Sequence, residues 1–332
     1  MKAISTTQDR PQDHSIDHPI RIGVSACLLG HHVRFDGGHK RNEFITETFG
    51  RFVEFIPVCP ELELGLGVPR ETLRLVRDRD TNLALVSNQS GTDHTAAMRT
   101  FADRRTAKLE REDLSGYLFK KDSPSCGMER VKVYGPAGMA SHDGRGLYAA
   151  SLMRRYPNLP VEEEGRLNDP RLRENFIERV FAYRRLRTFF AERWTLGGLV
   201  AFHTAHKLQL LAHVPTAYAE LGRLVASAKT ANRAELRDQY QTTFMTALKR
   251  LATPAHHTNV LQHMAGYFSD NLDSAARREL SSLIDDYRHG LVPLIVPITL
   301  IRHYVRAYSI SYLEGQVYLE PHPKELMLRN HV

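Results

Sequence analysis

The amino-acid sequence predicts an α/β domain with a largely parallel, Rossmann-like sheet, followed by an all-α domain. Between residues 20 and 157, short apolar runs rich in β-branched residues alternate with segments of helical pattern, and this alternation is typical of α/β folds. After residue 170, apolar residues recur with a helical period and no β-rich run follows. The two halves therefore belong to different structural classes.

The expected elements follow in chain order. Apolar runs predict strands at 20–27, 53–59, 83–87, 116–120 and 131–135, and helical patterns occupy 43–51 and 92–111. In the second half, helices are expected over 171–190, 195–213, 231–251, 259–268, 273–289 and 298–312.

The stretch YPNLPVEEEGRLNDPR separates the halves, because it combines three prolines with an acidic triplet. We therefore expect a flexible tail over residues 1–19, a first domain over 20–157, a linker over 158–170 and a helical domain over 171–332.

Composition excludes some classes of protein. Of the 332 residues, 42% are hydrophobic and 25% charged, as in soluble globular proteins. The apolar stretch 290–301 is too short to cross a bilayer and contains two prolines. The polar N-terminus lacks the apolar core of a secretory signal, and three cysteines cannot all pair. We expect a cytoplasmic protein with no membrane association.

The positive charge gathers in the helical half. The net charge is +7; residues 1–160 contribute +3, residues 171–250 contribute +8, and the remaining residues contribute −4. Arg184, Arg185 and Arg187 alternate with aromatic residues in AYRRLRTFF, and Lys207 follows in the next predicted helix. Although solvated helix faces often carry such charge, arginines beside aromatic rings also contact phosphates and stack on bases. We predict that these four residues bind a nucleic acid.

The three cysteines stand in matching positions. Cys27, Cys59 and Cys126 each follow an apolar approach and precede a turn, and ligands gather at the carboxyl ends of strands in α/β sheets. Three thiolates on one centre leave a coordination position open, as a catalytic metal requires. Soft thiolates suit iron-sulfur clusters or zinc, whereas the alternative is three inert buried cysteines. We expect the cysteines to meet at a metal centre.

The pattern VSACLLG, VRFDGGHK, PVCPE, GVPR and DSPSCG resembles the thiouracil desulfidase family over about residues 20–155. The segments FHTAHKLQLLAH and AYAELGRLVA resemble the helical YbgA-type domain. The fused arrangement is similar to that of bacterial transfer-RNA 4-thiouridine desulfidases. One departure is LELGLGVPR after Glu61, where short single-domain members carry Gly-Gly-Leu, and it favours a different, larger substrate.

The resemblance implies a 4Fe-4S cluster on the three cysteines and a non-redox exchange of C=S for C=O. The substrate it implies is 4-thiouridine in transfer RNA, converted to uridine with release of sulfide. Two alternatives remain open: an enzyme acting on free 2-thiouracil, and a non-catalytic RNA-binding or redox-sensing metalloprotein.

Such a reaction needs a general base for water. Glu61, two residues after Cys59, is the first candidate; Asp36 and Glu54 are alternatives. Ser123 would aim its hydroxyl at the substrate or merely bond its own turn, as serine before proline commonly does.

Two further groups of residues stand out in the sequence. Arg34 and Lys40, in VRFDGGHK, are expected to shape the substrate pocket. His203, His206 and His213 are expected on one helix face. No HExxH order accompanies these histidines, so we assign them no metal.

Overall fold

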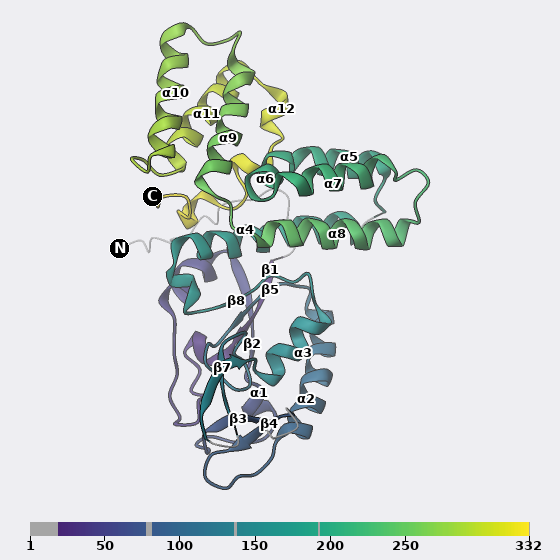
Figure 1. Ribbon diagram of the computed structural model, residues 1–332, viewed down its shortest axis with the longest axis vertical. Coiled ribbons are helices and arrows are strands. Elements are labelled where there is room, and N and C mark those ends of the chain that lie inside the picture. Colours follow the sequence, from purple (N-terminus) through teal and green to yellow (C-terminus); the bar gives the residue numbers. More distant parts are fainter. Residues whose placement is uncertain (1–18, 78–81, 136–137, 192, 332) are drawn as a thin grey trace, which may run out of the picture.

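The computed structural model describes residues 19–77, 82–135, 138–191 and 193–331. An α/β part and a helical part lie one above the other in Figure 1. The predicted tail at residues 1–19 lies outside the described residues except for Pro19.

The first sheet is fully parallel, as predicted, and has the order β2-β1-β5-β8. Its strands are β1 (Ile20–Ser25), β2 (Val53–Val58), β5 (Leu114–Phe119) and β8 (Val161–Glu163). Strand β5 is buried along its whole length and β1 almost so, which explains their continuous apolar runs. Because all four strands run the same way, their carboxyl ends meet at one edge.

A second sheet of mixed direction was not predicted. Its order is β4-β3-β6-β7, formed by β3 (Leu73–Arg77), β4 (Leu83–Ser87), β6 (Val131–Tyr134) and β7 (Ala140–Gly144). Only β3 and β6 pair in parallel, and the other two pairs are antiparallel. Most of β7 is exposed, so its sequence carries no apolar signal.

Three α-helices belong to the α/β part: α1 (Pro60–Glu63), α2 (Thr95–Lys108) and α3 (Leu147–Arg155). Helices α2 and α3 lie side by side (Figure 1), joined by a hydrogen bond of 2.7 Å from Ser151 to Asp103. The helix expected over 43–51 is present as two short turns, a π-helical one at Phe44–Thr48 and a 3-10 one at Phe49–Arg51.

The expected linker over 158–170 differs from the structure. Strand β8 lies inside it and pairs with β5. The acidic triplet that suggested a solvated linker is buried there: Glu162 pairs with Arg166, Glu164 pairs with Lys120, and Glu163 accepts from the Met128 amide. These partners are distant in sequence or invisible to a local pattern, so the sequence could not reveal the strand.

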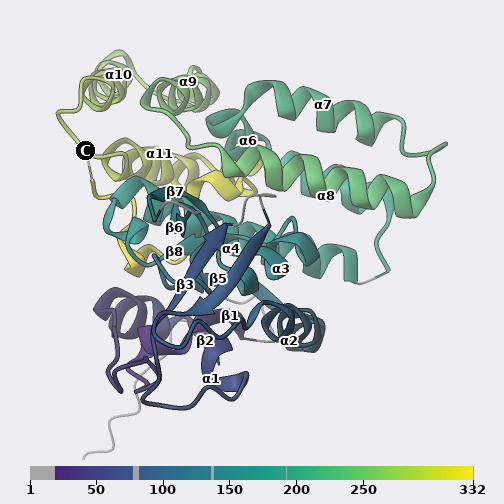
Figure 2. The same cartoon turned by 60° about the horizontal axis from the view of Figure 1, so that its bottom comes forward.

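The helical part begins with the long α4 (Pro170–Ala191). It continues with α5 (Leu196–Ala205), α6 (Lys207–His213), α7 (Pro215–Ala226), α8 (Arg233–Lys249), α9 (Pro254–Ala265), α10 (Ser274–Arg288), α11 (Ile295–Tyr308) and α12 (Ser311–Glu314). The single helix expected over 195–213 is thus broken at His206, and α7 was not among the predicted helices. Helices α7 and α8 run side by side in Figure 2.

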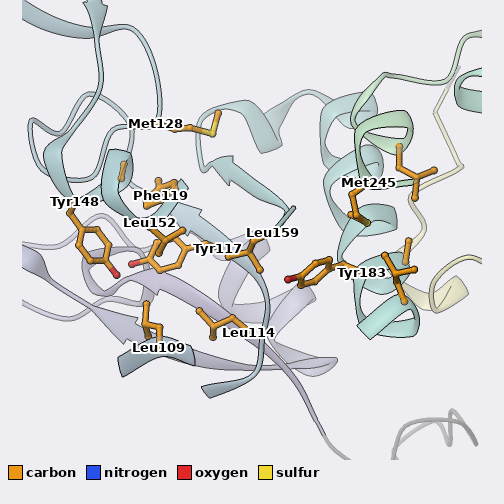
Figure 3. Close-up of a cluster of buried hydrophobic side chains, with 14 of the residues drawn as sticks. Leu109, Leu114, Tyr117, Phe119, Met128, Tyr148, Leu152, Leu159, Tyr183 and Met245 are labelled. Atoms are coloured by element: carbon orange, nitrogen blue, oxygen red, sulfur yellow. The ribbon is translucent and has the colours of Figure 1, made fainter. Parts of the chain in front are cut away.

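The two parts share one hydrophobic core. Tyr183 of α4 and Met245 of α8 belong to the same buried cluster as Leu114 and Leu159 of the α/β part (Figure 3). Helix α4 also lies directly on β5, because a Cβ at Gly116 would stand only 2.8 Å from a methyl carbon of Val180. The helical part is therefore packed against the sheet rather than tethered to it.

Across the described ranges, no helix is both long enough and apolar enough to cross a membrane.

Candidate active site

Each of the three cysteines follows a neighbouring strand of the parallel sheet. Cys27 lies in the 3-10 turn Ala26–Leu29 that directly follows β1. Cys59 comes directly after β2 and caps α1, where its amide donates to the Glu63 carboxylate at 3.1 Å. Cys126 lies in the turn after β5 and is 4% exposed. Since β2, β1 and β5 are adjacent, their carboxyl ends bring the three thiols to one place.

The three cysteines line one pocket of about 370 Å³, as the sequence predicted. Along the part of the chain that the structure describes, no three His, Cys, Asp or Glu side chains converge closely enough for a single metal ion. A cluster is held at separate iron corners, so its ligands need not converge on one point. The donor set of soft thiols around a shared cavity therefore fits an iron-sulfur cluster better than zinc.

Burial governs the protonation of these thiols. It raises the pKa of Cys27 to about 11, against the lowering effect of the Lys120 ammonium. It raises the pKa of Cys59 and, more strongly, that of Cys126, where the Glu61 carboxylate adds to the effect. Metal ligation requires thiolates, and desolvated thiols of this kind ionise only opposite positive charge. Ionisation of these thiols would therefore require a positive charge in the pocket.

Glu61 faces the pocket through a fixed network. The Nε and Nη2 atoms of Arg70 donate to its Oε2 at 3.0 and 2.5 Å. Its Oε1 accepts from the Ser125 hydroxyl at 2.7 Å, and that hydroxyl lies 3.7 Å from the Cys126 Sγ. Arg70 is itself held by the Val33 and Gly67 carbonyls. The carboxylate that the sequence favoured as base is therefore anchored on one oxygen and linked to the cysteines through the other.

Ser123 bonds its own turn, which is one of the two roles that the sequence left open. Its Oγ accepts from the Cys126 amide at 3.1 Å, so it bonds its own turn. It also lies 3.0 Å from the Ser125 Oγ and lines the pocket. Ser123 is thus one hydrogen bond further from Glu61 than Ser125 is.

The two alternative bases lie elsewhere. The side chain of Asp36 is 50% exposed, outside the pocket lining, and accepts from the Gly38 amide, which lowers its pKa. Glu54 is at the start of β2, at the opposite end of the strand from Cys59, and pairs with Arg21 at 3.0 Å. Neither carboxylate reaches the cysteines.

Positive and aromatic side chains surround the pocket mouth. Arg34 and Lys40 line it, as expected, together with Lys120 and Lys121. The Arg34 guanidinium lies over the ring of Phe35, 5.3 Å from its centroid, and Phe35 is 36% exposed. The pocket lining therefore combines cationic side chains with an aromatic ring.

The predicted basic patch of α4 is wrong as an open binding surface. Arg184 is buried and pairs with Asp113, and Arg187 pairs with the same carboxylate at 2.9 Å. Arg185 donates to the Pro321 carbonyl at 3.0 Å. Neighbouring positions on a helix point to different faces, and these three arginines instead join α4 to β5 and to the C-terminal segment.

Lys207 and the histidines also have internal partners. The Lys207 ammonium lies between the rings of Tyr218 and Tyr312, 5.9 and 5.8 Å from their centroids. The break at His206 removes the single helix face on which the three histidines were expected. Their Nδ1 atoms face different groups: the Tyr240 hydroxyl, the Phe202 carbonyl and the Arg250 carbonyl, for His203, His206 and His213 respectively.

Sequence reasoning missed Arg70, Ser25 and Lys120. Arg70 stood in the GVPR motif, but only the fold shows that it holds Glu61. Ser25 ends β1 beside Cys126, and its hydroxyl accepts from the Lys120 amide at 3.0 Å. For Ser25 and Lys120, the position at the carboxyl end of a strand was the available signal, whereas Arg70 lies in the loop before β3.

The chain resembles known proteins in both of its parts. A family model described as 2-thiouracil desulfurase matches residues 22–164. A second model, described as a protein of unknown function (DUF1722), matches residues 207–323.

Individual relatives agree with these matches. The chain is 36% identical to the uncharacterized protein YbgA of Escherichia coli (strain K12), over 49% of this chain and 98% of that protein. It is 30% identical to the uncharacterized protein YbbK of Bacillus subtilis (strain 168), over 45% of this chain and 98% of that protein. A solved chain described as [4Fe-4S]-dependent thiouracil desulfidase TudS is 31% identical, covering 45% of this chain and 94% of that one, with a TM-score of 0.36.

Proposed function

Since the chain belongs to the 2-thiouracil desulfurase family, with a helical part that matches the DUF1722 family, we propose that it converts 4-thiouridine in transfer RNA to uridine and releases sulfide. The observation that carries this proposal is the shared pocket in which three strand-end cysteines meet the Glu61, Arg70 and Ser125 network.

Cys27, Cys59 and Cys126 would hold a 4Fe-4S cluster, which supplies a thiophilic iron without a protein ligand for the thiocarbonyl sulfur. The donor chemistry supports this assignment, because the three thiols are soft, desolvated and grouped around one cavity.

The reaction is a hydrolysis. A water oxygen bonds to the ring carbon that carried sulfur, the carbon-sulfur bond breaks, and the two water protons leave with sulfur as hydrogen sulfide. Atoms and charge balance without an electron donor. The chain must therefore supply a group that takes a proton from water and returns it to the sulfur.

Glu61 has the position for this proton. Arg70 binds its Oε2, so Oε1 is the oxygen that receives the proton as water adds. The Ser125 hydroxyl, between Oε1 and the Cys126 Sγ, passes a proton toward the departing sulfur. Ser123 positions Ser125 through their shared hydrogen bond.

The pocket mouth supports a nucleotide in RNA over a free base. Lys40 lines the pocket and makes no ion pair with any described residue, whereas Arg34, Lys120 and Lys121 pair with Asp36, Glu164 and Asp122. A phosphate would supply the charge that Lys40 lacks, and free 2-thiouracil has no phosphate.

The direct test uses anaerobically reconstituted protein and transfer RNA that contains 4-thiouridine. We expect the near-ultraviolet absorbance of the thiolated base to disappear with release of one sulfide per base. Free 2-thiouracil and 4-thiouridine nucleoside are assayed in parallel. Turnover of 2-thiouracil alone would favour the free-base enzyme, and turnover of none of the three would refute the proposal.

A further inference from the structure

A second, larger cavity lies on the helical side of the parallel sheet. Its volume is about 1310 Å³. One wall consists of Pro19, Ile20 and residues 50–54, and the other of α11 and residues 319–330. We call it the basic cleft, and it shares no lining residue with the active-site pocket.

The charges of the basic cleft do not cancel. Of its carboxylates, Glu54 is neutralised by Arg21 at 3.0 Å and Glu320 by Arg302. Arg51, Arg306 and Lys324 line the same cleft, are exposed, and make no ion pair with any residue that the structure describes. Among the carboxylates that line the cleft, Glu325 alone makes no ion pair with a described residue, so three unpaired cations face one unpaired carboxylate.

Two of the arginines are also close neighbours. Arg302 and Arg306 stand one turn apart on α11, and burial together with the Arg306 charge lowers the pKa of Arg302. Like charges one helical turn apart are destabilising. Glu320 already offsets Arg302, so Arg306 is the one of the two whose charge a bound anion would balance.

The cleft and the active site lie at opposite ends of the same strands. Ile20 of β1 and Val53 of β2 line the cleft, whereas Ser25 and Val58, at the other ends of these strands, line the active-site pocket. At about 3.3 Å per residue, a six-residue strand separates its ends by roughly 17 Å. A single nucleotide therefore cannot reach both sites.

We infer that the basic cleft binds the phosphate backbone of the same RNA whose thiolated base enters the active-site pocket. The inference rests on the proposed function and adds a size requirement to it. A free base or single nucleotide cannot occupy both sites, whereas an RNA that continues for several nucleotides beyond the thiolated base and follows the protein surface can. An acidic protein segment is the competing occupant.

The test compares the wild type with the variant Arg51→Ala/Arg306→Ala/Lys324→Ala. We expect the Kd for thiolated transfer RNA to rise at least tenfold, and the slope of log affinity against log salt to fall by about one for each cation removed. Turnover of 4-thiouridine nucleoside and cluster absorbance should match the wild type, because none of the three side chains lines the active-site pocket.

The matched control removes three exposed arginines of α10, as Arg277→Ala/Arg278→Ala/Arg288→Ala. It changes the net charge equally but lies outside the basic cleft. RNA affinity should stay near the wild-type value. An equal loss in both variants, or no loss in either, would overturn the inference.

Oligonucleotides of increasing length separate this inference from the proposed function. With wild type, kcat/KM should increase sharply once the RNA is long enough to reach the basic cleft from the active-site pocket, and the cleft variant should lose this increase. Equal turnover of all lengths would refute RNA binding by the basic cleft, while the proposed desulfidase activity would still hold. If the enzyme turns over none of the oligonucleotides, the proposed function fails. The RNA affinities of the two variants then still test whether the basic cleft binds RNA.

Discussion

The two carboxylate oxygens of Glu61 bind different partners. Arg70 occupies Oε2 with two donors, and Ser125 donates to Oε1. The side chain is only 16% exposed, so its orientation is set by these partners rather than by solvent. Oε1, which Arg70 does not bind, is therefore the oxygen to which we assign the proton transfer.

Glu61→Gln should lower the turnover of thiolated RNA by at least about 100-fold, the lower range for loss of a general base. The amide keeps the side-chain shape but cannot take a proton from water. Sulfide release gives the rate, and visible absorbance shows whether the cluster is retained.

The comparison variant is Asp36→Asn, which removes the exposed alternative base. It should turn over near the wild-type rate. A large loss with Asp36→Asn and none with Glu61→Gln would reverse the assignment of the base.

Three buried histidines make stability depend on pH. Burial lowers the pKa of His206 and His257 to about 3 and that of His322 to about 4, whereas histidine in the unfolded chain titrates near 6.5. Between those values the unfolded chain binds more protons, so the free energy of unfolding falls as pH falls. Glu174, whose pKa burial raises to about 7, opposes this with a single proton.

Acidification from pH 6.5 to 5 should therefore destabilise the protein, with each histidine contributing about 1.4 kcal/mol per pH unit. Urea unfolding of the cluster-free chain at several pH values measures the slope. In His206→Phe the slope should decrease by about one proton. A stability that rises on acidification would contradict the assignment.

At the scale of elements, a buried ion pair joins the C-terminal segment to α4. Arg329 donates from Nε to Glu174 at 3.1 Å and from Nη1 to the Tyr318 carbonyl at 2.7 Å. Both charged side chains are nearly excluded from solvent, at 4% and 12% exposure. Removal of either partner alone leaves a buried charge.

Arg329→Met should lower the free energy of unfolding by about 3 kcal/mol, because Glu174 would lose its cation in a desolvated site. Urea denaturation measures the loss. Adding Glu174→Gln should recover part of it, since the double variant has no unpaired charge. If the double variant loses the sum of both single losses, the pair does not interact as described.

Some elements could be predicted from the sequence and others could not. Strands β1 and β5 were visible because burial on both faces requires continuous apolar runs, and the cysteines that follow these strands and β2 marked the site. Strand β7 is mostly exposed, and β8 is short and rich in glutamate, so neither has such a run. The break at His206 carries no glycine or proline to mark it.

The partners of charged residues were the least predictable feature. The arginines of α4 seemed free because Asp113 is 71 residues from Arg184 in sequence. Only the packing of α4 on β5 brings them together. The cations that remain exposed, in the basic cleft, come from three distant segments.

One hydrophobic cluster of the molecule crosses from sheet to helices, and another lies wholly within the helical part. Helices α4 and α8 contribute to the same buried cluster as β5 and α3. Since both parts lose packing if either unfolds, we expect cooperative behaviour.

Trp194, the single tryptophan, lies in the helical part and reports on this cooperativity. Urea unfolding followed by its fluorescence should coincide with unfolding followed by far-ultraviolet circular dichroism. Two separated transitions, with fluorescence following only one, would show that the parts unfold independently.

The central claim is that three thiols from adjacent strand ends hold a cluster with one iron free for sulfur. The most direct test is iron and sulfide analysis, with EPR after dithionite reduction, of anaerobically reconstituted wild type and the single serine variants of Cys27, Cys59 and Cys126. We predict about four iron and four sulfide per wild-type chain, a spectrum altered by added 4-thiouridine, and loss of the cluster in each variant. One zinc without sulfide, or a spectrum indifferent to 4-thiouridine, would contradict the account.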